Sequence, residues 1–141
     1  SKRPEYFQPF LSRFPENVIL LTTLETNRDQ GYGSISKAPC PSDRFQQFRA
    51  LDYPHKVVTI EPILDFDLNE FAAWIESIRP EYVWLGFNSK PESVTLPEPP
   101  EEKVQKLAER LLAAGIEVRG KTLRGVVLPD DSAQRSVKES Q

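Results

Sequence analysis

Residues 56–67 read KVVTIEPILDFD, and this stretch decides the fold. It begins as a β-branched apolar run, which is typical of a parallel strand that is buried on both faces. It then places three carboxylates, Glu61, Asp65 and Asp67, at or just past its carboxyl end. In barrels and open α/β sheets, that end of a strand is where ligands bind. The stretch therefore predicts a buried strand over residues 57–64 with a polar site at its carboxyl end.

The same order of apolar strand and polar strand end recurs along the chain. Apolar runs predict further strands over residues 18–24, 82–87 and 116–119. Helical spacing of apolar residues predicts the end of a helix over 6–13, full helices over 44–51 and 101–114, and a further helix between Asp67 and Pro80. Strands that alternate with helices indicate the α/β class with a parallel sheet of repeated βα units. Such a set amounts to half of a (βα) partial TIM-like barrel, or to an open sheet with one under-covered face.

Residues that favour helix ends lie beside three of these helices. Ser42 and Asp43 are expected to cap the start of helix 44–51, and Asp67 is expected to cap the start of the next one. Gly115 follows the last helix and is suited to the C′ position, where glycine adopts a left-handed backbone readily. These residues fix the expected boundaries between helix and loop.

Length and composition bound the classes of protein. The chain has 141 residues, which suits one domain over residues 1–128, and a polar, aromatic-free tail over 129–141 is expected to be disordered. A net charge of −3 gives no indication of a nucleic-acid binder dominated by phosphate contacts. No apolar stretch is long enough to cross a bilayer, so no membrane partner and a cytoplasmic location are expected. The start without methionine fits either a processed native start or a fragment of a longer protein.

The chain holds one cysteine, Cys40, and one histidine, His55. A single cysteine excludes an intrachain disulfide and a cysteine-only metal cluster, and the predicted metal ligands are none. Cys40 lies in a proline-flanked loop, and His55 precedes a strand and so belongs to the opposite sheet edge. Neither is expected to act in catalysis, and no catalytic residue is identified.

The predicted strand ends gather polar side chains of both charges at one sheet edge, which can hold a polar or zwitterionic small molecule. These candidates are Glu25, Asn27, Arg28, Glu61, Asp65, Asn88, Ser89, Lys90, Lys121 and Arg124. Structural readings stand beside the functional one: Arg28 and Lys90 also suit solvated loop charges, and Asn88 with Ser89 also suits a turn. Glu61 lies in an apolar run, where a charge is costly unless it is paired.

Four of these strand ends resemble the later strand ends of an uncharacterised group of radical SAM-like proteins. The segments are residues 22–28 (TTLETNR), 59–67 (TIEPILDFD), 85–90 (LGFNSK) and 121–124 (KTLR), and the resemblance covers residues 1–124. It implies a partial (βα)₆ barrel in which a 4Fe–4S cluster donates an electron to S-adenosylmethionine. The cluster loop of that family, Cys-x₃-Cys-x₂-Cys, is absent from this chain. The chain would then be a carboxy-terminal part, inactive alone, whose cluster lies in a missing amino-terminal half; the other possibility is a protein that naturally lacks the cluster.

The resemblance also implies roles for the strand-end residues. The cofactor-binding set would be Glu25, Asn27, Arg28 and Glu61, and the substrate-binding set would be Asp65, Asn88, Ser89, Lys90, Lys121 and Arg124. The partner would be the missing half-barrel, or a second copy associating through the open sheet face. Two alternatives stay open: a stand-alone module that binds a small ligand without catalysis, and a cluster-free hydrolase or lyase using Glu25 and Glu61 as acid and base.

Overall fold

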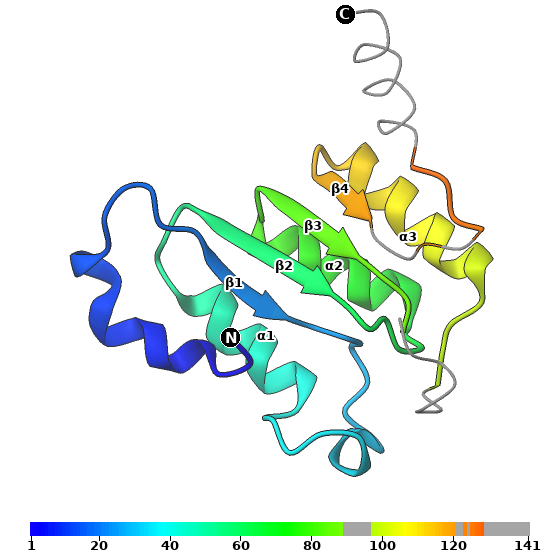
Figure 1. The fold of residues 1–141 in the computed structure, drawn as a ribbon, viewed down its shortest axis with the longest axis horizontal. Coiled ribbons are helices and arrows are strands. Elements are labelled where there is room, and N and C mark those ends of the chain that lie inside the picture. The colour runs from blue at the N-terminus through cyan, green and yellow to red at the C-terminus, as the bar shows by residue number, and fades with distance from the viewer. Residues whose placement is uncertain (89–96, 121–122, 124, 129–141) are drawn as a thin grey trace, which may run out of the picture.

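The computed structural model describes residues 1–88, 97–120, 123 and 125–128. Strands and helices alternate along this part of the chain, as Figure 1 shows. In chain order the elements, with η for a 3-10 helix, are η1 (Pro4–Arg13), β1 (Leu20–Thr23), η2 (Tyr32–Ser34), α1 (Pro41–Ala50), β2 (Lys56–Ile60), α2 (Leu68–Ile78), β3 (Tyr82–Leu85), α3 (Glu101–Ala113) and β4 (Glu117–Gly120). The predicted α/β class is confirmed.

The four described strands form one sheet in the order β1-β2-β3-β4, and every neighbouring pair is parallel. One row of the register runs from Thr22 to Val58, Val83 and Val118. Because all four strands point the same way, their carboxyl ends lie at one edge. The predicted parallel sheet of βα units is confirmed, and this edge is where the strand-end residues gather.

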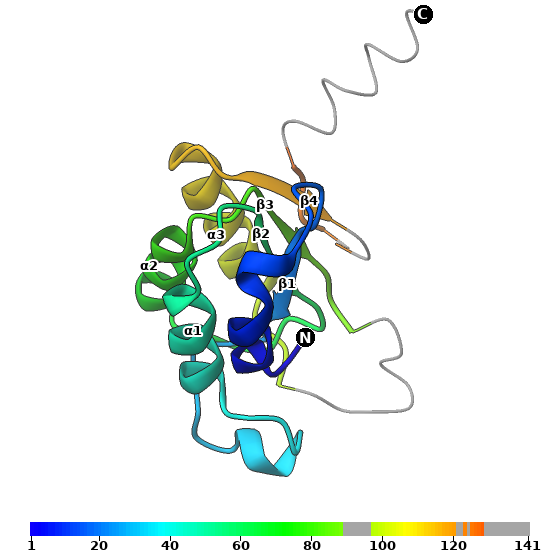
Figure 2. The same cartoon turned by 90° about the vertical axis from the view of Figure 1, so that its left-hand side faces the viewer.

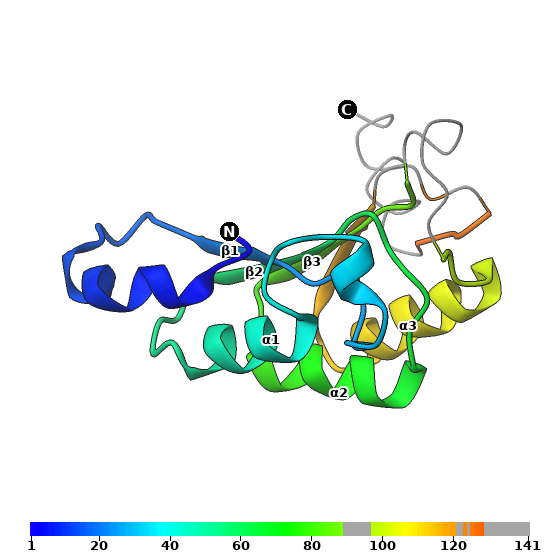
Figure 3. The same ribbon diagram turned by 90° about the horizontal axis from the view of Figure 1, so that it is seen from below.

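Helices α1, α2 and α3 lie on one face of the sheet, as Figures 2 and 3 show. The strand residues that point toward the helices, such as Val58, Ile60 and Leu85, belong to the hydrophobic core. Their neighbours Thr59 and Trp84 alternate to the opposite face and are only half-buried. Within the described ranges no helix covers that face, which agrees with an open sheet that has one under-covered face.

Helix α2 buries the predicted apolar stripe and ends where the sequence predicts. Phe71, Ile75 and Ile78 recur at helical spacing, and all three are buried in the core. Arg79 follows with a positive φ of 56°, and Pro80 cannot continue the helix. The stripe therefore fixes which face of α2 packs on the sheet. Because α2 follows β2, its N-terminal end lies at the polar edge.

Helix α3 is amphipathic in the same way and ends at a glycine. Val104, Leu107 and Leu111 are fully buried against the sheet. Gly115 has a φ of 85°, in the left-handed region that side chains rarely adopt. The prediction of Gly115 as the C′ residue is confirmed.

Strands β1, β2 and β3 are shorter than predicted, whereas β4 has the predicted length and is shifted by one residue. The predicted strand 57–64 begins at Lys56 and ends at Ile60, because Pro62 has no N–H to continue a ladder and the following residues turn away along the edge. The prediction of 18–24 shrinks to Leu20–Thr23, and that of 82–87 shrinks to Tyr82–Leu85. The residues cut off belong to the loops that build the polar edge.

One predicted helix start is wrong, and the predicted helix end over residues 6–13 belongs to a 3-10 helix. Helix α1 begins at Pro41 with Cys40 as its N-cap residue, not at Ser42 or Asp43, because proline suits the first helical position. Ser42 instead bonds to the carboxylate of Asp29. Residues 4–13 form a 3-10 helix with Pro9 inside it, since a proline removes one donor of a regular α-helix. The predicted tail over 129–141 lies outside the described residues.

Candidate functional site at the carboxyl edge of the sheet

Backbone hydrogen bonds fasten the strand-end loops to one another. Leu64 N donates to Glu25 O at 2.9 Å, and Ile63 N donates to Gly86 O at 2.8 Å. Asp65 N donates to Pro97 O at 2.6 Å, which adds the segment that leads into α3. The segment after β2 therefore lies between the ends of β1 and β3. This brings Asp65 and Asp67 beside the residues that follow β1.

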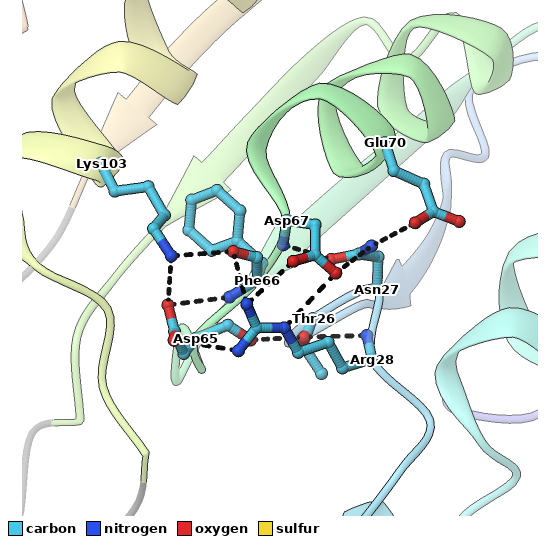
Figure 4. A network of polar contacts seen from close by, with 8 residues as sticks. All are labelled: Thr26, Asn27, Arg28, Asp65, Phe66, Asp67, Glu70 and Lys103. Atoms are coloured by element: carbon cyan, nitrogen blue, oxygen red, sulfur yellow. Dashed lines mark hydrogen bonds and ion pairs between the residues drawn. The ribbon is translucent and has the colours of Figure 1, made fainter.

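Arg28 and the two aspartates form an ion-pair network, shown in Figure 4. Arg28 Nη1 lies 3.0 Å from Asp65 Oδ2, and Arg28 Nη2 lies 2.9 Å from Asp67 Oδ1. The Arg28 side chain is 42% exposed, so water screens these pairs. Arg28 therefore lies beside the acids after β2, as predicted. Its positive charge is paired with the negative charges of Asp65 and Asp67 within the chain.

Asn27 connects this network to helix α2. Its Nδ2 donates to Glu70 Oε2 at 3.0 Å, and its Oδ1 accepts from Asp67 N at 2.8 Å (Figure 4). Asp67 occupies the N-cap position of α2, but its side chain makes no cap hydrogen bond and pairs with Arg28 instead. Asp67 is therefore the N-cap residue, as predicted, and its carboxylate binds Arg28 in the network.

Lys103 of helix α3 also joins the network, and no sequence pattern singled it out. Its Nζ lies 2.7 Å from Asp65 Oδ1 and donates to Phe66 O at 3.0 Å (Figure 4). Lys103 sits in the first turn of α3, where a cation is unfavourable to the helix dipole unless it has an anionic partner. The positive charge of Lys103 in the first turn of a predicted helix was the sequence feature that could have indicated an anionic partner.

The charges around the two aspartates determine their protonation. Partial burial raises the pKa of Asp65, but the hydrogen bond and charge of Lys103 and the charge of Arg28 outweigh it, so its pKa lies below the ordinary value. The hydrogen bond from Arg28 lowers the pKa of Asp67. Both groups are therefore anions at neutral pH and act as acceptors, not as general acids.

Glu25 lies apart from this network in a buried cluster of its own. Arg44 Nη2 lies 2.8 Å from Glu25 Oε2, and Lys2 Nζ lies 2.9 Å from Glu25 Oε1. The hydroxyl of Tyr32 contacts both carboxylate oxygens at 3.1 to 3.2 Å. Arg44 and Tyr32 were not predicted as site residues. Arg44 shares a helix face with Phe48, four residues later, and an arginine within an apolar stripe was the signal for it.

The environment of Glu25 does not suit proton transfer. Burial raises its pKa, but the hydrogen bond from Lys2 and the charge of Arg44 together lower it by more than burial raises it. The pKa of Glu25 therefore lies below the ordinary value. A general acid working near neutral pH needs the opposite shift. Glu61 is half-buried and accepts a hydrogen bond from Trp84 Nε1 at 3.1 Å. This contact is a hydrogen bond from a neutral indole, so the functional role predicted for Glu61 stays a prediction. The arrangement gives no support to an acid–base pair of Glu25 and Glu61.

A small hollow of about 160 Å³, open to solvent, lies beside the network between the ends of β1 and β2. Arg28, Gln30 and Asp65 line its polar part, and Tyr32 and Ile35 line its apolar part. Such a mixture of apolar wall and a few polar groups of both signs is typical of small-molecule sites. Of the predicted residues, Arg28 and Asp65 line this hollow. Glu25 and Asn27 do not line it; Glu25 bonds to Tyr32 of its wall, and Asn27 bonds to Asp67 of the network.

The remaining predicted residues follow β3 and β4 along the chain. Asn88 is half-buried at the end of β3. Ser89, Lys90, Lys121 and Arg124 lie outside the described residues. Among the residues that are described, no group of three or more His, Cys, Asp or Glu side chains could hold a metal ion.

Comparison of the chain with protein-family models, curated proteins and solved structures gives no match. No helix in the described ranges is both long and apolar enough to cross a membrane.

Proposed function

We propose that the chain is the carboxy-terminal part of a radical SAM-like enzyme and that the carboxyl edge of its sheet binds a polar small molecule. The observation that carries the proposal is the all-parallel order β1-β2-β3-β4 with its helices on one face, because a barrel is built from such sequential βα units. The hollow beside Arg28 and Asp65 lies at the edge where such folds bind their ligands.

The outer edge of β1 supports this proposal. Ser1 N donates to Leu21 O at 2.6 Å, and Thr22 Oγ1 donates to Ser1 O at 2.7 Å. The segment before η1 therefore lies along β1, on the side away from β2. A preceding strand of a barrel would pair at this same edge. The partners implied are a further half-barrel or, through the uncovered sheet face, a second copy.

The two cofactors of the family, the 4Fe–4S cluster and S-adenosylmethionine, differ in how well the residues of this chain could bind them. A 4Fe–4S cluster needs several thiolates, and the chain has one cysteine, so the cluster does not fit here and would belong to another part of the protein. S-adenosylmethionine carries an ammonium and a carboxylate, which Asp65 and Arg28 match in charge. A ligand carboxylate would compete with the exposed Asp67 for Arg28, and a ligand ammonium would compete with Lys103 for Asp65.

A protein extended upstream tests the enzyme proposal. We expect the upstream sequence to contain a strand followed by Cys-x₃-Cys-x₂-Cys. The extended protein, when purified without oxygen, should be brown and should contain iron and sulfide. Replacing the three cysteines by alanine is the control and should remove the iron. An upstream reading frame without this loop would contradict the enzyme proposal.

A stand-alone binding module is the second candidate, and one observation favours it: Arg28 and Asp65 offer the hollow both of the charges that a zwitterionic ligand needs. If so, S-adenosylmethionine or a small anion at about 100 times its dissociation constant should raise the melting temperature by roughly 5–10 °C. Arg28→Gln should abolish the rise, whereas Arg79→Gln, which removes an exposed arginine after the opposite end of α2, should preserve it. No shift across a panel of anions and nucleotides would exclude this candidate.

A further inference from the structure

The loop between β1 and α1 forms one wall of the hollow. Its residues Gln30, Tyr32 and Ile35 line the hollow, while Arg28 lines it from the same loop nearer to β1. At its start the loop is joined to the neighbouring segments, since Leu24 N donates to Thr59 O and Glu25 O accepts from Leu64 N. Over residues 29–36 the described backbone bonds are local, such as Tyr32 N to Asp29 O and Ile35 N to Tyr32 O. Local turns of this kind shape residues 29–36 but do not fix them against the rest of the protein. Their position must come from side chains.

Arg44 of helix α1 supplies that fixation. Its guanidinium donates to the backbone oxygens of Thr23 and Pro39, which lie at the two ends of the loop. It also donates to Glu25 Oε2 at 2.8 Å and to the hydroxyl of Tyr32 in the middle of the loop. One planar group with several fixed donors therefore holds the start, the middle and the end of the same loop.

The environment makes this contact rigid. The Arg44 side chain is 0% exposed and that of Glu25 is 4% exposed, so water does not compete for these bonds. The guanidinium lies over the Tyr32 ring at 5.0 Å from its centroid. A lysine keeps the charge of Arg44 but has a single ammonium, and it cannot reach four oxygens that are spread over the loop.

A second contact ties the same loop to the same helix. Asp29 accepts a hydrogen bond from Ser42 N at 2.9 Å, and the Ser42 hydroxyl donates to the other Asp29 oxygen. The start of α1 thus binds the loop at Asp29, and its interior binds the loop at Tyr32. Arg44 itself does not line the hollow.

We propose that Arg44 is a positioning residue for the ligand site: through Glu25 and the Tyr32 hydroxyl it sets the wall formed by residues 30–35, and so it sets the affinity of the hollow for a small zwitterionic ligand. The affinity part of this inference rests on the proposed function. The positioning part is independent of the ligand and predicts a local effect. Loss of the Arg44 contacts should free residues 29–36 while strand β2 keeps its protection.

Amide hydrogen exchange on the chain measures the positioning part. Arg44→Lys and Tyr32→Phe should each increase exchange of residues 29–36 by roughly tenfold, which corresponds to one lost charge-assisted hydrogen bond. Exchange over residues 56–60 of β2 should stay within about twofold of the unaltered chain, because only a local opening is affected. Tyr32→Phe removes one hydroxyl and is the variant that keeps the test valid if Arg44→Lys does not fold.

Two control variants separate positioning from general destabilisation. Phe48→Leu alters a 0% exposed core residue on the same helix and should raise exchange over the whole sheet without singling out residues 29–36. Arg49→Lys alters an exposed arginine on α1 and should change neither region. An equal response of residues 29–36 to Phe48→Leu and to Tyr32→Phe, or no response to Tyr32→Phe, would overturn the proposal.

Binding of S-adenosylmethionine, followed by calorimetry on the same variants, measures the affinity part. Arg44→Lys and Tyr32→Phe should weaken binding by roughly tenfold, and Arg49→Lys should not change it. If the unaltered chain does not bind this probe, S-adenosylmethionine is not the ligand of the hollow and the affinity part fails for it, while the exchange measurement still decides the role of Arg44. Unchanged affinity in Tyr32→Phe, with binding intact in the unaltered chain, would contradict the coupling.

Discussion

Glu25→Gln lowers the free energy of unfolding by about 3–5 kcal/mol, because it leaves a buried guanidinium without its counter-charge. Arg44 is 0% exposed and Glu25 is its anionic partner at 2.8 Å. Glutamine has nearly the same shape and still offers one oxygen, so packing is kept and the lost charge is the main change. Urea unfolding of both chains, followed by circular dichroism, gives the difference.

The matched control for this prediction is Glu16→Gln, which makes the same chemical change at an exposed position. Its effect should stay within about 0.5 kcal/mol. A loss below about 1 kcal/mol in Glu25→Gln would mean that the cluster does not hold a desolvated charge.

The same residue predicts a pH dependence. The folded pKa of Glu25 lies below its ordinary value of about 4.5, because Lys2 and Arg44 outweigh the effect of burial. A lowered carboxyl pKa means that the unfolded chain binds more protons, so the stability from Glu25 is fully present above the ordinary pKa and is lost as pH falls through the folded pKa. The difference between the unaltered chain and Glu25→Gln should therefore shrink as the pH falls from neutrality to about 3. A difference that stays constant over this range would contradict the ion pair.

Phe66→Ala is the second large effect, with an expected loss of about 3–5 kcal/mol of unfolding free energy. Phe66 is 0% exposed although it lies between Asp65 and Asp67, the two acids of the exposed network. Its ring packs against Phe71 of α2 at 5.2 Å between centroids, and Lys103 Nζ lies 5.5 Å from the ring centre. The ring anchors the acidic segment to the core, so its removal should weaken both the fold and the network.

Urea unfolding measures the stability change, and two variants control for it. Phe66→Leu keeps most of the volume and should cost less than about 1.5 kcal/mol. Phe10→Ala removes the same ring from an exposed position, 49% accessible, and should cost less than about 1 kcal/mol. Comparable losses in Phe10→Ala and Phe66→Ala would show that burial of the Phe66 ring is not what stabilises the edge.

The order of strands and helices could be predicted because it depends on local pattern. The run at residues 56–60, the stripe of Phe71 and Ile75, and Gly115 after α3 each follow from hydrophobicity or backbone preference within a few residues. The strand ends were less predictable: residues 61–64 continue the apolar pattern of β2 but leave the ladder. A strand boundary depends on which donors a neighbouring strand can pair with, and Pro62 offers none.

The candidate site divides in the same way. Sequence placed Glu25, Arg28 and Asp65 at one sheet edge, because parallel strands bring their carboxyl ends together. It did not separate Glu25, which is buried with Arg44, from Arg28 and Asp65, which line the hollow. Pairing depends on which side chains from distant segments come within about 4 Å, and spacing along the chain does not encode that distance.

The amino-acid sequence by itself determined the α/β class, the parallel strands and the presence of charges of both signs at one edge, because these follow from periodicity and from chain direction. Only the tertiary structure decided which of those charges neutralise one another and which line the hollow. The reason is physical: a charge in an apolar run must find a partner, but the identity of that partner is set by packing. Arg44 and Lys103 reach the edge from helices that pack beneath it, and their roles exist only once α1 and α3 have docked on the sheet.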